Sequence, residues 1–175
     1  MVTKNVEKAL NEQIIKEEHS SRLYVAMASW CERNGFPGAT SWLYAQAEEE
    51  RMHMLKLVHY LNDRGGHALM DKLEAPANTY KSLKDIFQQV LKHEEFISAS
   101  INEIYAVSQK EKDFTTANFL LWYINEQIEE ESNARNILDQ INLTGTEKGG
   151  QFLMDKELSA LAAAKIAAAA ANPPA

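Results

Sequence analysis

Residues 86–104 read IFQQVLKHEEFISASINEI and combine the pattern of a buried helix with an acidic residue in its middle. The apolar residues recur every three or four positions, which is the spacing of one face of an α-helix. They are Ile86, Val90, Ile97, Ile101 and Ile104. Glu94 falls on the same face. We therefore expect a long helix whose buried face carries a carboxylate.

Three other segments show a similar pattern. Helical periodicity predicts helices from Asn5 to Arg33, from Ala39 to Arg64, and from the charged break at 110–113 to about Asn142. The helix around Glu94 should begin after a Ser82 cap and end near Gln109. Polar residues interrupt the apolar faces midway, and they are Glu17, Tyr24, Glu50, His53, Gln127 and Glu130. All four helices therefore carry polar groups at mid-height.

The connections indicate how these helices are joined. Short links at 34–38 and 110–113 predict antiparallel hairpins, whereas residues 67–81 are long enough to travel the length of a bundle. A fifth helix is expected from Gln151 to about Lys165. The alanine-rich stretch 162–171 could extend it, fray in solvent or be an artificial addition. We expect an all-α domain over residues 1–160 and a tail over 161–175.

Composition excludes several classes of protein. A formal charge of −7 argues against nucleic-acid binding, which depends on clustered Lys and Arg. The polar N-terminal residues do not resemble a signal peptide, and no apolar stretch before the tail is long enough to span a membrane, so a cytoplasmic protein is expected. The single Cys31 makes neither an internal disulfide nor a thiolate cluster. Any metal site must use oxygen and nitrogen ligands.

Charge balance favours a metal site inside the bundle. The buried acids Glu17, Glu50, Glu94 and Glu130 would each carry a negative charge, and the four apolar faces hold no Lys or Arg. An unpaired buried carboxylate is strongly destabilising, and two divalent cations would neutralise all four. Carboxylates with one imidazole suit iron or manganese, and the inward Tyr24 favours iron because it suits redox chemistry.

Each of these features has a simpler explanation when taken alone. A Glu-x-x-His pair such as Glu50 and His53 is common on exposed helices, and Tyr24 could serve only for packing. The acidic runs 48–50 and 126–131 could be solvated faces. The combination on four helices is what indicates a site.

Several motifs in chain order resemble bacterial non-haem ferritins, members of the ferritin-like family. They are Glu17 with Tyr24, AEEERMH at 47–53, KHE at 92–94, WYINEQIEEE at 122–131 and DKEL at 155–158. The resemblance implies that Glu17, Glu50 and His53 hold one iron. Glu50, Glu94 and Glu130 would hold a second iron, with Gln127 and Tyr24 beside the pair. A third iron would lie at Glu49, Glu126, Glu129 and Glu130.

The resemblance also implies a function. Such a protein is a ferroxidase that oxidises Fe(II) with dioxygen or hydrogen peroxide and stores ferric mineral inside a homo-oligomeric cage of 24 subunits. Haem is not expected, because Arg51 follows Glu50 where bacterioferritin carries its haem-binding Met.

Two other functions are compatible with the same helices. One is a ferritin-like di-iron enzyme that reduces peroxide without storing mineral, as rubrerythrin relatives do. The other is a metal-free structural bundle, which is disfavoured because its buried acids would lack counter-charges.

Overall fold

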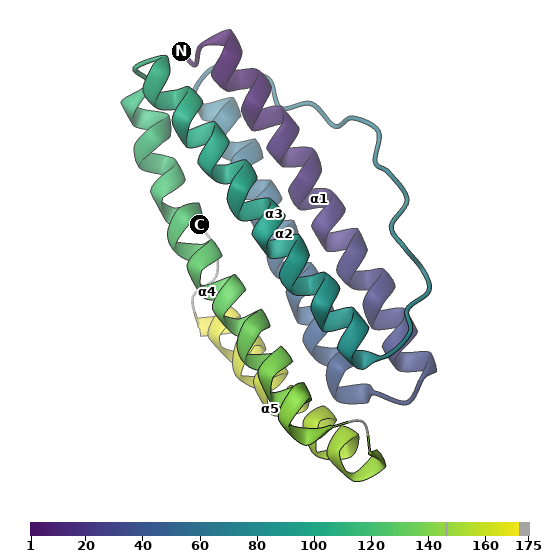
Figure 1. The fold of residues 1–175 in the computed structure, drawn as a ribbon. Coiled ribbons are helices and arrows are strands. Elements are labelled where there is room, and N and C mark those ends of the chain that lie inside the picture. Colours follow the sequence, from purple (N-terminus) through teal and green to yellow (C-terminus); the bar gives the residue numbers. More distant parts are fainter. Residues whose placement is uncertain (146, 172–175) are drawn as a thin grey trace.

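The computed structural model describes residues 1–145 and 147–171. Within these residues the chain is entirely helical, without strands. The helices are α1 (Lys4–Arg33), α2 (Pro37–Asp63), α3 (Leu83–Lys110), α4 (Phe114–Thr144) and α5 (Lys148–Ala171). The first four form the bundle, and α5 folds back beside it (Figure 1). The all-α four-helix bundle with a fifth C-terminal helix is thereby confirmed.

Local side-chain chemistry explains where the helices begin. The side chains of Thr3, Ser82 and Asp113 accept hydrogen bonds from backbone N–H groups in the first turns of α1, α3 and α4. Such caps satisfy donors that have no partner within the helix. Helix α2 begins at Pro37, because proline has no N–H to lose and its fixed φ suits the first turn. The expected Ser82 cap is confirmed.

The connection between α2 and α3 spans the length of the bundle (Figure 1). Its first part is fixed to α1, since Asn11 Nδ2 donates to the His67 carbonyl at 3.0 Å and accepts through Oδ1 from the Leu69 N–H at 2.7 Å. Near its other end, Tyr80 is buried in the core. The predicted crossover therefore joins two antiparallel hairpins, α1 with α2 and α3 with α4.

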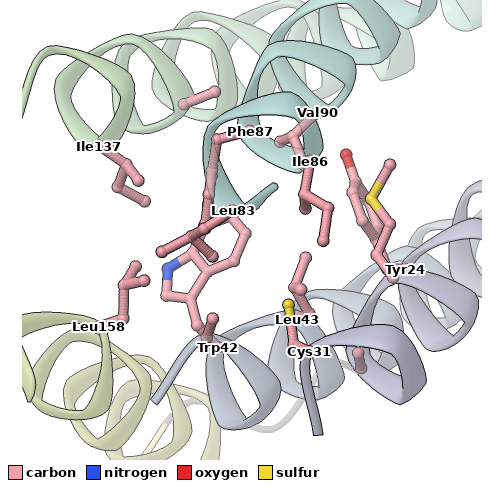
Figure 2. Packing of buried hydrophobic residues seen from close by; sticks show 14 of the residues in the cluster. Tyr24, Cys31, Trp42, Leu43, Leu83, Ile86, Phe87, Val90, Ile137 and Leu158 are labelled. Atoms are coloured by element: carbon pink, nitrogen blue, oxygen red, sulfur yellow. The ribbon is translucent and has the colours of Figure 1, made fainter. Parts of the chain in front are cut away.

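The apolar core is divided into two clusters along the bundle. One cluster gathers around Tyr24, Trp42, Phe87 and Leu158 (Figure 2). The other contains Val6, Leu10, Leu57, Ile101 and Leu120. On each of the first four helices the chain passes from one cluster to the other, and the predicted polar residues fall near the change. The bundle thus carries a polar band between two apolar halves.

Helix α5 is longer than expected at both ends, although it is still the shortest of the five helices. The alanine-rich stretch 162–171 continues this helix, which is the first of the three alternatives given for it. Alanine has the highest helix propensity, which explains the extension. Residues 172–175 of the tail lie outside the described residues. The buried residues of α5 are Met154, Asp155, Leu158 and Ala162.

The docking of α5 on α2 depends on a close backbone contact. Asp155 accepts hydrogen bonds from the Gly38 N–H at 3.0 Å and the Ala39 N–H at 2.9 Å, and so caps α2 from another helix. A Cβ atom at Gly38 would lie 1.7 Å from the Asp155 carbonyl oxygen. Only glycine allows the two helices to approach this closely.

Among the described residues, none of the helices has the length and apolar character required to cross a membrane.

Replacing this glycine tests how strongly α5 is held. We expect Gly38→Ala to displace α5. It should lower the free energy of unfolding by about 1–3 kcal/mol, the usual cost of overpacking. Gly149→Ala is the matched control, because a Cβ there meets nothing within 4 Å. Thermal unfolding followed by circular dichroism measures both variants. Equal melting temperatures for Gly38→Ala and the unsubstituted protein would contradict this explanation.

Candidate metal centre

The polar band places four carboxylates in the interior of the bundle. Glu17 is 1% exposed, Glu50 2%, Glu94 1% and Glu130 4%, and each comes from a different helix of the first four. The other predicted inner residues are also buried, namely Tyr24, His53 and Gln127. The sequence therefore predicted the burial of these residues, and the structure shows how they group.

The first group consists of Glu17, Glu50 and His53. Each offers a ligand atom, and these atoms lie within 4.8 Å of one another. Glu17 Oε1 accepts a hydrogen bond from Gln13 Nε2 at 2.7 Å, whereas Oε2 has no hydrogen-bond partner in the described part of the chain. A buried oxygen without a donor is costly unless a cation completes its coordination. This group could hold a metal ion.

The remaining inner acids are held by hydrogen bonds. Tyr24 donates its hydroxyl proton to Glu94, and Gln127 Nε2 lies 3.2 Å from Glu94 Oε2. Gln46 Nε2 donates to Glu50 Oε1 at 3.0 Å and to Glu130 Oε2 at 2.9 Å. Amide and phenol donors thus hold the carboxylates that the resemblance assigns to a second iron.

The third predicted group is only partly brought together. Ligand atoms of Glu49, His53 and Glu126 lie within 4.8 Å of one another. Glu129, by contrast, is exposed at the bundle surface. The structure therefore also places His53 beside the outer acids Glu49 and Glu126. The sequence pattern did not indicate this proximity, because it assigned His53 only to the inner group.

Burial and mutual repulsion control the ionisation of the acids. Burial, reinforced by the charge of Glu50, raises the pKa of both Glu17 and Glu94 to about 8. Burial also raises the pKa of Glu130 well above its ordinary value, although Lys165 opposes this. Without metal, Glu17 and Glu94 are therefore largely protonated at neutral pH.

Glu50 and His53 form the charged pair of the centre. Burial alone would raise the pKa of Glu50, but contact with His53 and the hydrogen bond from Gln46 outweigh it and lower that pKa to about 2. Conversely, burial would lower the pKa of His53, but Glu50 and Glu17 raise it to about 10. Their closest atoms, His53 Nδ1 and Glu50 Oε2, are 3.6 Å apart.

A basic residue that the sequence analysis did not connect with the site also reaches it. Lys165 of α5 pairs with Glu49, lies 3.7 Å from Glu130 Oε1, and donates to Gln46 Oε1 at 2.5 Å. The four bundle faces do lack Lys and Arg, but the charge balance omitted this cation from α5. The available signal was the spacing of Met154, Leu158, Ala162 and Lys165 along one helical face.

A second set of positioning residues supports Glu17. Lys16 Nζ donates to Ser100 Oγ at 2.5 Å, Ser100 Oγ donates to Gln13 Oε1 at 2.6 Å, and the Gln13 amide in turn donates to Glu17. Because Gln13 Oε1 accepts from Ser100, its NH₂ group must face the carboxylate. Helical periodicity places Gln13 on the same face of α1 as Glu17, but its pairing with Ser100 depends on the packing of α1 against α3.

An all-α bundle with carboxylates and a histidine projecting inward from its helices defines a class of metal-binding helical proteins. Comparison with known proteins identifies the family within this class. The family model described as a ferritin-like domain matches residues 7–144. The chain belongs to the ferritin family.

Individual relatives match nearly the whole chain. A probable bacterial non-heme ferritin-like protein of Haemophilus influenzae is 44% identical over 92% of this chain and 98% of its own length. The bacterial non-heme ferritin of Campylobacter jejuni is 42% identical over 93% of this chain and 97% of its own. Among solved structures, an open pore ferritin from Archaeoglobus fulgidus superposes with a TM-score of 0.89 at 36% identity, over 91% of this chain and 98% of that one.

The raised pKa values of Glu17 and Glu94 predict pH-dependent metal binding. A carboxylate must lose its proton to coordinate a cation, so binding of Zn²⁺ at pH 7 should release protons from these residues. The affinity for Zn²⁺ should consequently rise as the pH increases from about 6 to about 8, the window below the raised pKa values. Calorimetric titration in buffers of different ionisation enthalpy measures the protons released. An affinity independent of pH over this range would contradict the assignment.

Proposed function

We propose that this protein stores iron and is a ferroxidase, oxidising Fe(II) to Fe(III) at a two-iron centre in the polar band of each subunit. Membership of the ferritin family supports iron storage and oxidation in general terms. The observation that carries the more specific proposal is the group of Glu17, Glu50 and His53, with its buried Glu17 oxygen that lacks a donor in the described residues.

In this proposal Fe(II) is the substrate and occupies two adjacent positions. Glu17, Glu50 and His53 would bind the first ion, and Glu50, Glu94 and Glu130 would bind the second. Glu50 would bridge them, which suits its position beside both groups and its low pKa. Two Fe(II) ions would supply two electrons to dioxygen or hydrogen peroxide, so the protein need only position the ions and admit the oxidant.

Tyr24 and Gln127 would control the orientation of Glu94. Both donate hydrogen bonds to its carboxylate, so they hold it in place before metal arrives. Burial raises the pKa of the Tyr24 hydroxyl well above its ordinary value, and nearby Glu94 raises it further, so the hydroxyl remains a donor at neutral pH. These two residues act beside the irons and not as the principal ligands.

The outer acids would provide a third iron position. Glu49 and Glu126 lie together with His53, and Glu130 connects this group to the inner one through Lys165 and Gln46. We assign the third ion to Glu49, Glu126, Glu129 and Glu130. Glu129 would have to turn inward from its exposed position to take part.

Storage requires a compartment, for which we propose a homo-oligomeric cage of 24 subunits in the cytoplasm. Large apolar side chains stand exposed on the single subunit, including Phe96 (53%), Phe114 (65%), Ile128 (65%) and Phe152 (70%). Contacts between subunits would bury such side chains, and aromatic residues are enriched at the buried centres of interfaces. The relatives named as ferritins support the same arrangement.

Removing the proposed bridging ligand tests the mechanism. Glu50→Ala should slow the initial oxidation of Fe(II) by more than about 100-fold, since loss even of an outer partner to a ligand costs about 10- to 100-fold in metal affinity or activity. Glu48→Ala is the control, because Glu48 is exposed on the same helix. Stopped-flow absorbance after mixing with Fe(II) in air gives the rates. Rapid oxidation by Glu50→Ala would show that the bridging assignment is wrong.

Iron loading distinguishes storage from the alternative function. Size-exclusion chromatography after aerobic addition of Fe(II) should yield a large assembly that retains many irons per subunit. A small oligomer that turns over peroxide and retains only its bound irons would instead identify a di-iron peroxide-reducing enzyme.

A further inference from the structure

We propose that the Lys165 ammonium is a tethered cation that takes the place of a metal ion between Glu49 and Glu130 and leaves it when metal binds. The C-terminal part of α5 would then be a displaceable cover over the outer metal position. This inference rests on the proposed function, because it takes Glu49 and Glu130 to be metal ligands.

The register of α5 on α2 brings Lys165 to this position. Asp155 is fixed at the start of α2 by its hydrogen bonds to Gly38 and Ala39. A helix rises about 1.5 Å per residue, so Lys165 lies about 15 Å beyond Asp155, and Glu49 lies the same distance beyond Ala39. Parallel helices with this starting contact therefore bring Lys165 level with Glu49.

The contacts of Lys165 resemble those of a bound ion. Its ammonium group forms an ion pair with Glu49 and lies 3.7 Å from Glu130 Oε1. It also donates a hydrogen bond to Gln46 Oε1 at 2.5 Å. Only 20% of its side chain is exposed, and the ammonium lies 5.8 Å from the centre of the Trp42 ring. Three oxygen-bearing residues from two helices thus surround one positive charge.

Lys165 also fixes the orientation of an amide inside the centre. Because the Gln46 oxygen accepts from Lys165, the Gln46 NH₂ group must face Glu50 and Glu130. Those hydrogen bonds hold two of the proposed ligands of the second iron. Departure of Lys165 would free Gln46 to turn and release both carboxylates, so occupation of the outer position is coupled to the inner one.

The two parts of α5 are held very differently. Before Lys165, the side chains of Met154, Leu158 and Ala162 are buried in the core. After it, Ile166 is 56% exposed and residues 167–171 are exposed alanines. Little buried apolar area would therefore become exposed to water if residues 166–171 moved away from the bundle. A divalent cation placed a few ångströms from Lys165 would repel it strongly, so the two cations exclude each other.

Metal titration of the assembled, metal-free protein tests the proposal. Lys165→Met keeps the apolar stem and removes the charge, and Lys156→Met is the control from the exposed face of α5. We expect Lys165→Met to bind Zn²⁺ about tenfold more tightly at the outer position, the order of effect of removing one competing charge. Lys156→Met should bind as the unsubstituted protein does.

Hydrogen exchange gives a second measurement that does not depend on the variants. Zn²⁺ should accelerate amide exchange over residues 163–171 of the unsubstituted protein while leaving residues 151–160 protected. Unchanged exchange together with equal Zn²⁺ affinity in Lys165→Met would overturn the proposal. If, in that case, Glu50→Ala nevertheless weakened Zn²⁺ binding, the proposed function would stand without the cover. If Zn²⁺ bound to none of the proteins, both would fail.

Discussion

Four carboxylates lie in the middle of an apolar bundle, and the remaining structure has to compensate for the cost of burying them. Ionised carboxylates without partners would cost several kcal/mol each after relaxation and would repel one another. The chain responds partly by protonation, since the pKa values of Glu17 and Glu94 are raised to about 8. It also supplies the hydrogen-bond donors Gln13, Gln46, Tyr24 and Gln127, and the positively charged partners His53 and Lys165.

This compensation is incomplete in a manner that suits metal binding. Glu17 keeps one oxygen without a donor in the described part of the chain, next to Glu50 and His53. The apolar clusters on either side of the band keep the four helices rigid, so these ligand atoms stay together in the absence of metal. Stability thus comes from the two ends of the bundle, and the middle is available for chemistry.

Much of this could be predicted from the sequence, because helical periodicity determines which residues share a face. Glu94 within residues 86–104 is the clearest example, since five aliphatic residues around it define the buried side. Burial of the acids followed from the same periodicity. Periodicity does not assign each acid to a particular iron, because that assignment depends on coordination and not on burial.

The contribution of α5 could not be predicted in the same way. A lysine in an alanine-rich segment is ordinarily solvated, and such a segment forms a helix without indicating what it contacts. The position of Lys165 depends on the register of α5 against α2, which a tertiary contact between Gly38 and Asp155 sets. Similarly, the proximity of His53 to Glu126 depends on how α2 and α4 are spaced.

In the proposed mechanism, the polar band binds two irons that share Glu50. Anomalous diffraction at the iron absorption edge, from crystals soaked in Fe(II), tests it most directly. Two peaks inside the bundle are predicted, one contacting Glu17 and His53 and the other contacting Glu94 and Glu130, with Glu50 touching both. Iron found only at the protein surface, with none between the two apolar clusters, would contradict the account.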